Sequence, residues 1–331
     1  MPHTIDRRRL LTALAATSAT ALIPSREAWA QSTYPDKAVR LSVGFAPGTA
    51  PDVAARTIGQ RLGETMKQPI VIDNRAGAGG QIAAQAVAKS APDGYNLLIA
   101  DVAAISIAPA AFSKLPYNPA TELMVLSEMV RTDFVLVVPA TSKARTVADF
   151  MKQSAADANR IPFGTFGAGT VHHFGSEVLA ELGRFKVEPI HYRATGDAVA
   201  GVSTGDVQGA FWSTPLTAAQ VKGGKVRALA ITSPKRSPLL PDVPTFAEAG
   251  IPQADFAAWF CLFAPAGTPA PIAAYLTREV IAAVQTPDVK HRLEEAGFTV
   301  VGSSQADAQK MLATEGARWG AVVKSTGFKG D

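Results

Sequence analysis

Residues 38–52 read AVRLSVGFAPGTAPD, and they contain the unit from which the rest of the chain is built. The run 38–45 is apolar and includes β-branched residues, which predicts a buried strand. Gly48 lies in the short loop that follows, and Pro51 stands at the start of a helix, where its missing N–H costs no hydrogen bond. A strand that leads through a short loop into a helix indicates an α/β fold.

The same alternation continues along the chain. Apolar residues recur at steps of four from Ala54 to Met66 and predict a helix with one apolar face. The next predicted strands, 70–74 and 96–101, have a helix between them, which favours a parallel sheet covered by helices on both faces. Later strands are expected at 133–140, 187–192, 207–213, 226–232 and 257–265.

Two α/β lobes account for this order of elements. The chain has 331 residues, of which 47% are hydrophobic, enough for two cores. The runs 124–138 and 256–264 are long enough to cross from one lobe to the other. We therefore expect residues 31–132 and 257–331 to form one discontinuous lobe, and residues 133–256 to form the second.

The first thirty residues have the features of a secretory signal peptide. Three arginines at 7–9 precede the apolar run 10–23, and an Ala-Trp-Ala cleavage pattern ends at Ala30. The apolar run is shorter than the roughly 18 residues of a membrane-spanning helix. We expect cleavage after Ala30 and export from the cytoplasm. The arginines also fit a twin-arginine signal, so both export routes stay open.

Charge and cysteine content exclude two classes of protein. Without its first thirty residues the chain has 28 basic and 26 acidic residues, a net charge of +2. Because no cluster of Lys and Arg with interleaved aromatics is present, we expect no nucleic-acid partner. Cys261 is the only cysteine, so no intramolecular disulfide can form.

Two glycine-rich loops precede helices in the first third of the chain. Residues 45–52 offer the free backbone N–H groups of a helix start, which suits a carboxylate or phosphate, although an ordinary strand-to-helix turn has the same pattern. Residues 74–81, NRAGAGGQ, lack a P-loop lysine, and Ile82 interrupts the G-x-G-x-x-G spacing. Dinucleotide binding is therefore not supported.

A third glycine-rich loop lies in residues 163–179, FGTFGAGTVHHFGSEVL. Its glycines permit positive φ angles, and Thr170 stands where a helix N-cap belongs. His172 and His173 follow in the first helical turn, where adjacent side chains point about 100° apart and cannot easily ligate one metal ion. We expect another backbone site for an anion here, and no metal.

Nothing in the chain favours catalysis. It has no G-x-S-x-G motif, its cysteine lies in an apolar run, and its aspartates are scattered. We expect no enzymatic activity, no catalytic residue and no cofactor. The alternative is an extracytoplasmic hydrolase or isomerase on a two-lobed scaffold, with His172, His173 or Asp52 as its base. Two anion-binding loops in different lobes instead suit a small molecule with a carboxylate at each end.

The order and spacing of these motifs resemble the Bug family, the periplasmic substrate-binding components of tripartite tricarboxylate transporters. The segments that carry the resemblance are 34–56, 71–100, 163–179, 225–250 and 259–269. The resemblance implies a two-lobed periplasmic-binding-protein fold (type II), α/β in both domains, with a hinge and a ligand cleft between them. It also implies a monomer in the periplasm that captures a small carboxylate and delivers it to membrane permease subunits. Presentation of the ligand to a sensor kinase is a further alternative.

The resemblance also implies which residues hold the ligand. In relatives the loop written FAPGT here holds one ligand carboxyl largely through backbone groups and waters, and the loop written TFGAGTVHH holds the other end. Carried over to this chain, the ligand-binding residues are Phe45, Ala46, Gly48, Thr49, Asp52, Gly167, Gly169, Thr170 and His173.

Three departures from the family pattern bear on the ligand. Thr49 stands where relatives commonly have glycine, and Phe166 and Ala168 stand in place of the residues Ala and Asn of AGNGTSQH. Trp212 and Ser213 replace an Asp-Asn pair, whose acid can meet an amino group. We therefore count Phe166, Ala168 and Trp212 among the ligand-binding residues and expect an aromatic or longer apolar carboxylate. The alternative is that Phe166 and Trp212 pack in the core of their lobe.

Overall fold

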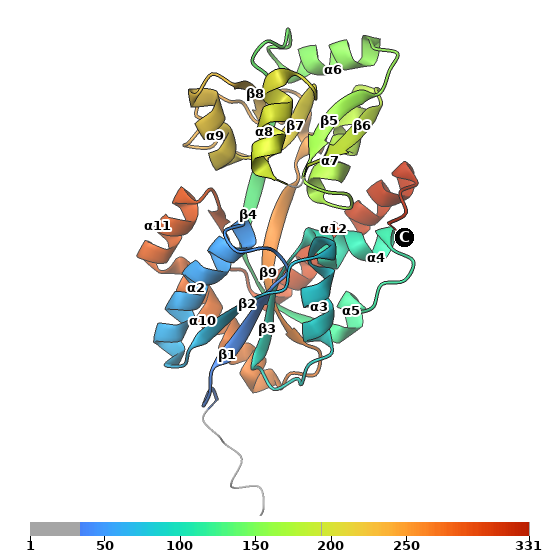
Figure 1. The fold of residues 1–331 in the computed structure, drawn as a ribbon. Helices are drawn as coiled ribbons and strands as arrows, with labels where there is room; N and C mark the ends of the chain where they lie inside the picture. Colours follow the sequence, from blue (N-terminus) through green and yellow to red (C-terminus); the bar gives the residue numbers. More distant parts are fainter. Residues whose placement is uncertain (1–33, 193, 331) are drawn as a thin grey trace, which may run out of the picture. The chain divides into compact units, whose positions relative to one another are not determined.

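A computed structural model describes residues 34–192 and 194–330 (Figure 1). The predicted signal peptide, residues 1–30, lies outside these described residues. By their contacts, residues 1–36 form one unit and residues 37–331 another, and the elements below all belong to the second. No helix in the described part of the chain is both long and apolar enough to cross a membrane.

The first α/β units form as predicted from the sequence. Strand β1 (Val39–Val43) lies between β2 (Ile70–Asn74) and β3 (Asn96–Asp101), and all three run parallel. Helix α2 (Ala50–Met66) connects β1 to β2 and buries the predicted apolar face, while α3 (Gln81–Ala88) leads to β3. The expectation of an α/β fold is confirmed.

Two antiparallel strands connect the parts of the sheet. Strand β9 (Ala257–Pro265) pairs with β3 on one side and with β4 (Leu123–Pro139) on the other. The first part of β4, up to Asp133, pairs with β9, and the part from Phe134 pairs with β7 and β8. These two strands coincide with the apolar runs expected to cross between lobes. Cys261 lies on β9 and is buried.

The remaining strands lie on the far side of β4. Strand β5 (Ile161–Thr165) runs parallel to β6 (Val187–His191) and β7 (Gly209–Ser213), and β8 (Val226–Ile231) pairs with β4. The order across the sheet is β2-β1-β3-β9-β4-β7-β5-β6, so β1 and β5 each lie within a parallel group on opposite sides of the β9–β4 pair. In Figure 1 these two groups appear below and above the middle of β4.

Helices cover the sheet and connect its strands. Those beside β5 to β8 are α6 (Val147–Ala156), α7 (Val171–Gly183), α8 (Thr195–Thr204) and α9 (Thr214–Lys222). After β3 come η2 (Ala103–Ile107), α4 (Ala108–Ala111) and α5 (Pro119–Glu122), and after β9 come α10 (Ala270–Gln285), α11 (Pro287–Glu295) and the long α12 (Gln305–Thr326). Short elements η1 (Ala78–Gly80), η3 (Pro252–Ala254) and β10 (Thr299–Val300) complete the fold.

Candidate carboxylate-binding site

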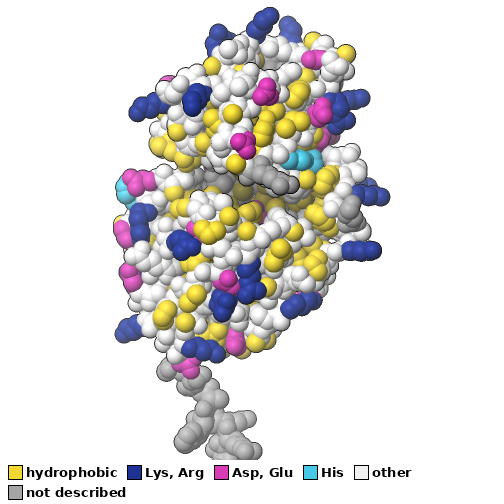
Figure 2. Space-filling model, in the orientation of Figure 1, with side chains coloured by type: hydrophobic (Ala, Val, Ile, Leu, Met, Phe, Trp, Pro, Cys, Tyr) yellow, Lys and Arg dark blue, Asp and Glu magenta, His cyan; other side chains and the backbone are white. Residues whose placement is uncertain are grey.

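Two loops follow the carboxyl ends of β1 and β5 and precede α2 and α7. We call residues 45–49 the first loop and residues 166–170 the second loop. Ligands of open α/β sheets bind outside the carboxyl ends of parallel strands, so both loops are in the position that a ligand site needs. Figure 2 shows the surface hollowed between the two groups of elements, with hydrophobic side chains along the margins.

The first loop is fastened by a buried carboxylate. Asp52 is only 2% exposed, and its Oδ2 accepts hydrogen bonds from the Gly48 N–H at 2.8 Å and from Arg56 Nε at 3.0 Å. Asn74 Nδ2 lies 2.9 Å from the other oxygen, Oδ1, and 3.0 Å from the Phe45 carbonyl oxygen. The end of β2 and the first turn of α2 thus hold the loop between them.

These partners keep Asp52 ionised. Burial raises the pKa of its carboxyl, but the hydrogen bonds from Arg56, Gly48 and Asn74 outweigh burial, and the pKa lies below the usual value. An ionised carboxylate that accepts bonds from its own loop has little remaining capacity to contact a ligand. Asp52 therefore acts as a positioning residue for the first loop.

Thr49 leaves the start of α2 open. Its hydroxyl donates to the Ala46 carbonyl at 2.6 Å and makes no capping bond to the helix. Gly48 has a φ of +82°, which L-residues with a side chain rarely adopt. The first-turn N–H groups of α2 consequently have no cap from Thr49, and Ala46 and Gly48 are exposed. This arrangement suits an anion.

The second loop is fastened by a buried imidazole. His173 is 5% exposed, and its Nδ1 accepts a hydrogen bond from the Gly169 N–H at 3.1 Å. The Thr170 hydroxyl donates to the Gly167 carbonyl at 2.8 Å and lies 3.4 Å from the His173 N–H, so Thr170 is the predicted N-cap. Gly167 and Gly169 have φ angles of +124° and +74°. Ala168, between them, is exposed.

His173 is neutral at physiological pH. Burial, together with a smaller contribution from the neighbouring His191, lowers its pKa to about 4. Because Nδ1 accepts the Gly169 N–H, the ring proton is on Nε2. The ring packs edge-on against His191 and Phe328, with centroids 5.3 Å and 5.0 Å away. His173 thus holds the second loop without adding a charge to it.

His172 has different neighbours from His173. Its ring lies edge-on to Phe134 and Phe166, with centroid distances of 4.6 Å and 5.1 Å, and burial lowers its pKa to about 4. The two histidines therefore do not converge on one point. In the described residues, no group of three His, Cys, Asp or Glu side chains could hold a metal ion.

Trp212 lies in the core beside the second loop. Its side chain is 0% exposed and belongs to a cluster with Val135 and Val202, and the partly buried Phe166 packs against that cluster. Trp212 Nε1 has no hydrogen-bond partner among the described residues. Phe166, the first residue of the second loop, therefore packs against this core, whereas Trp212 has no exposed surface.

The second loop also approaches the other group of elements. A Cβ added to Gly169 would lie 3.9 Å from the Phe112 ring, and Phe112 follows α4. The Gly330 N–H donates to the Ala111 carbonyl at 2.8 Å, so the end of the chain contacts α4 as well. Phe328 contacts His173, and the C-terminal segment thus touches both α7 and α4.

Sequence reasoning missed Asn74, which contacts the first loop, Phe328, which contacts His173, and Asp101, which lies at the same sheet edge as the first loop. Asn74 and Asp101 end strands β2 and β3, at the sheet edge where the first loop begins. Polar residues at the ends of predicted parallel strands were the available signal for both. Phe328 gave no such signal, because a lone aromatic near a chain end has no pattern.

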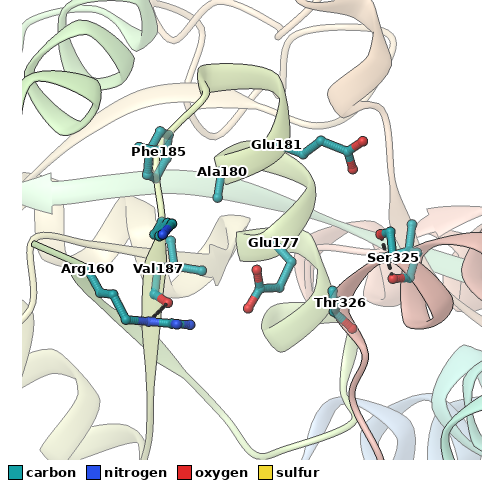
Figure 3. Close-up of a pocket in the computed structure, with 10 residues that line it drawn as sticks. Arg160, Glu177, Ala180, Glu181, Phe185, Val187, Ser325 and Thr326 are labelled. Carbon is teal, nitrogen blue, oxygen red and sulfur yellow. Dashed lines mark hydrogen bonds between the residues drawn. The ribbon is translucent and has the colours of Figure 1, made fainter. Parts of the chain in front are cut away.

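A separate groove lies along α7 (Figure 3). Its volume is about 290 Å³, and it is enclosed by α7, α12 and the starts of β5 and β6. Arg160 donates a hydrogen bond to the Val187 carbonyl at the rim of the groove. Burial raises the pKa of Glu177 above its usual value, although the charge of Arg160 partly opposes this rise. None of the predicted ligand-binding residues lines this groove.

Comparison with known proteins identifies the family. The model of the family described as "Tripartite tricarboxylate transporter family receptor" matches residues 54–328. Protein BugT of Bordetella pertussis is 33% identical over 298 residues, which are 90% of this chain and 91% of BugT.

Solved structures of the same type share the fold. MatC from Rhodopseudomonas palustris, solved with bound malate, is 31% identical with a TM-score of 0.77 and covers 88% of this chain and 100% of its own. Another R. palustris protein, solved with adipate, is 31% identical with a TM-score of 0.80 and covers 89% and 99%. These findings confirm the resemblance and the fold class expected from the sequence. The chain therefore belongs to the tripartite tricarboxylate transporter receptor family and is one of its periplasmic solute-binding proteins.

Proposed function

We propose that the protein captures a small carboxylate between the first and second loops and delivers it to the permease subunits of a tripartite tricarboxylate transporter. The observation that carries this proposal is the paired construction of the two loops. Each loop precedes a helix N-terminus. Each also donates a glycine N–H to a buried side chain, the first loop to Asp52 and the second loop to His173. Backbone N–H groups at such starts bind carboxylates.

The proposal includes the two lobes expected from the sequence. Residues 31–132 and 257–331 form one lobe and residues 133–256 the other, with β4 and β9 as the hinge segments. Closure of the lobes removes water from the ligand, and weak hydrogen bonds from backbone N–H groups strengthen in the lower dielectric. Residues 1–30 direct the chain to the periplasm, where it acts as a monomer.

The ligand is a carboxylate with an apolar body. Phe166, His172 and Phe134 form a row of ring contacts next to the second loop. Aromatic rings provide large apolar contact area for a ligand. The relatives solved with malate and adipate bind dicarboxylates, and adipate has an apolar chain between its carboxylates. The preference for an apolar body rests on Phe166 and His172, since Trp212 is fully buried.

A hydrolase or isomerase is disfavoured by the state of the three candidate bases. Asp52 already accepts three hydrogen bonds, from Gly48 of the first loop, Arg56 of α2 and Asn74 of β2. His172 and His173 have pKa values of about 4, which makes both weak bases at neutral pH. In addition, His173 Nδ1 is occupied by Gly169. Delivery to a sensor kinase would use the same ligand site with another partner.

Ala168 provides a test with a matched control. It is exposed in the middle of the second loop, so Ala168→Asp and Ala168→Asn both fit there and differ mainly in charge. We expect Ala168→Asp to weaken carboxylate binding at least about tenfold, since like charges repel at close range, and Ala168→Asn to weaken it far less. Isothermal titration calorimetry with malate, adipate and phthalate measures both.

A thermal-shift screen over the same carboxylates checks the ligand class. Stabilisation by adipate or phthalate is expected. Stabilisation by hydroxylated or amino acids alone would rule out the apolar preference. Equal affinities in Ala168→Asp and Ala168→Asn would show that the second loop does not face the ligand's charge.

A further inference from the structure

Asp101 is a buried carboxyl group that forms no ion pair with any described residue. It ends β3 and is 8% exposed. Its Oδ1 accepts hydrogen bonds from the backbone N–H groups of Ala103 and Ala104, at 3.2 Å and 3.4 Å. None of the ion pairs in the described part of the chain includes Asp101. Burying an unpaired carboxylate is costly, so this group needs either a proton or a partner from outside the protein.

Asp101 lies at the same sheet edge as the first loop. Strands β1 and β3 are parallel neighbours, with Val43 paired with Ile99, so the chain leaves both strands on the same side. Gly80 packs between the segment that follows β1 and the segment that follows β3. A Cβ added to Gly80 would lie 3.5 Å from the Ala104 Cβ and 3.6 Å from the Phe45 ring. The turn that binds Asp101 thus packs close to the loop proposed to hold a ligand carboxylate.

The surroundings of Asp101 favour its protonated form. Burial raises the pKa of Asp101 to about 7, although hydrogen bonds from backbone N–H groups, including those of Ala103 and Ala104, partly oppose this rise. Across the sheet Asp101 is paired with Phe260 of β9, which is apolar. The titratable group that faces it is Tyr117, whose hydroxyl donates to the Ala104 carbonyl at 2.6 Å and whose pKa is raised, so that it stays neutral. No charge from these neighbours opposes a proton on Asp101.

We propose that Asp101 contacts the ligand and donates the proton of its neutral carboxyl to a ligand carboxylate oxygen in a hydrogen bond. This inference rests on the proposed function, and it specifies that Asp101 is protonated when the site binds its ligand. The proton comes from the solvent and stays on Asp101, and no covalent bond of the ligand changes. A ligand anion beside Asp101 stabilises the neutral carboxyl further, so above neutral pH each bound ligand brings about one proton with it.

The sign of the pH dependence follows from this linkage. At pH 6 Asp101 is largely protonated with or without ligand, so its own titration contributes little to the pH dependence of the affinity. Above pH 7 the free protein has lost the proton that the complex keeps, so the affinity falls by about tenfold per pH unit. An ionised Asp101 that accepts a hydrogen bond from a ligand ammonium group would give no such loss.

Calorimetry on the mature protein tests this with malate and adipate as probes. Titrations at pH 6, 7 and 8, in two buffers of different ionisation enthalpy, report the number of protons taken up. We expect uptake of about one proton at pH 8 and at least about fivefold weaker binding at pH 8 than at pH 7. Asp101→Asn keeps a donor of similar shape, so we expect it to bind at pH 6, without proton uptake and with an affinity that no longer depends on pH.

Asp73→Asn is the matched control. Asp73 lies on β2, and its hydrogen bonds to Arg75 and Arg40 lower its pKa, so it is ionised throughout this pH range. The control variant should therefore keep the pH dependence of the wild type. If Asp101→Asn does not fold, a wild-type protein that takes up no proton at pH 8 still overturns the proposal.

Three outcomes contradict the proposal. Wild-type affinity that is equal at pH 6 and pH 8, with no proton uptake, overturns it and leaves carboxylate capture intact. Wild-type pH dependence that persists in Asp101→Asn assigns the proton to another group. Absence of binding by malate, adipate and phthalate at every pH counts against the proposed function itself, and this proposal then fails with it.

Discussion

At the scale of single residues, Asp52 and His173 both position a glycine-containing loop, although one is a carboxylate and the other a neutral imidazole. Each is buried, each follows a glycine-containing loop by a few positions, and each accepts a hydrogen bond from a glycine N–H of that loop. The carboxylate needs a cation nearby, which Arg56 supplies, whereas the neutral imidazole needs none. A neutral acceptor leaves the second loop free of a negative charge that would repel a ligand carboxylate.

His173 gives a prediction at this scale. His173→Phe keeps the ring contacts with Phe328 but removes the acceptor, and it leaves the N–H of buried Gly169 without a partner. We expect this change to lower the free energy of unfolding by about 1–3 kcal/mol and to weaken ligand binding. Urea unfolding and calorimetry measure the two effects.

The control is His173→Asn, whose side-chain oxygen can accept the same N–H. It should recover part of the lost affinity although it fills less space. If both variants bind ligand like the wild type, His173 does not position the second loop.

At the scale of elements, the site depends on where strands end and helices begin. Pro51 and Thr170 are predictable start signals, and both helices begin beside them. The holding contacts come from other elements: Asn74 of β2 binds both Asp52 and the Phe45 carbonyl. One side-chain amide thereby joins the end of β2, the first loop and α2.

Asn74 is accordingly a test of the first loop. Asn74→Ala removes the hydrogen bonds from the Asn74 amide to Asp52 and to the Phe45 carbonyl. Asn74→Asp places a second carboxylate next to Asp52. We expect Asn74→Ala to destabilise the protein by about 1–2 kcal/mol and Asn74→Asp to destabilise it more at pH 7 than at pH 4, because only the ionised carboxylates repel. Thermal unfolding of both variants at the two pH values provides the comparison.

The mutation Asp73→Asn, one residue earlier on the same strand, serves as the control for the strand itself. Its effect on carboxylate affinity should be small. An Asn74→Ala variant with unchanged affinity would mean that the first loop needs no fastening from β2.

At the scale of the whole unit of residues 37–331, segments far apart in sequence meet around α7. Phe328 contacts both His173 and Phe174, with ring centroids 5.0 Å and 5.5 Å apart. Two residues later, Gly330 donates to Ala111. The C-terminal segment thus supports the second loop through His173.

Phe328→Ala tests this support. Loss of a half-buried ring is expected to lower the free energy of unfolding by about 1–3 kcal/mol and to increase amide hydrogen exchange in residues 167–170. The control is Lys329→Ala, which changes the exposed side chain of the next residue and should alter neither quantity. Unchanged exchange in the second loop of Phe328→Ala would contradict a supporting role.

Much of the fold could be predicted because its signals are local. The apolar runs 38–45 and 257–265 contain β1 and β9, because buried parallel or central strands are apolar throughout. Steps of four from Ala54 mark the buried face of α2. The candidate loops could be found for the same reason, since glycines and an N-cap threonine act over a few residues. Trp212 could not be placed, because an aromatic residue near a strand end fits both a core and a ligand site.

The sequence by itself determined the α/β alternation, the two loops before helices and the family to which the chain belongs. Only the tertiary structure decided that Asp52 and His173 turn back onto their own loops and that Trp212 packs in the core. It also decided that Asp101 is buried near the first loop with no ion pair to a described residue. The physical reason is that hydrogen-bond partners and burial depend on residues from distant parts of the chain. Backbone propensities and apolar periodicity depend on near neighbours, and these can be read directly from the order of the amino acids.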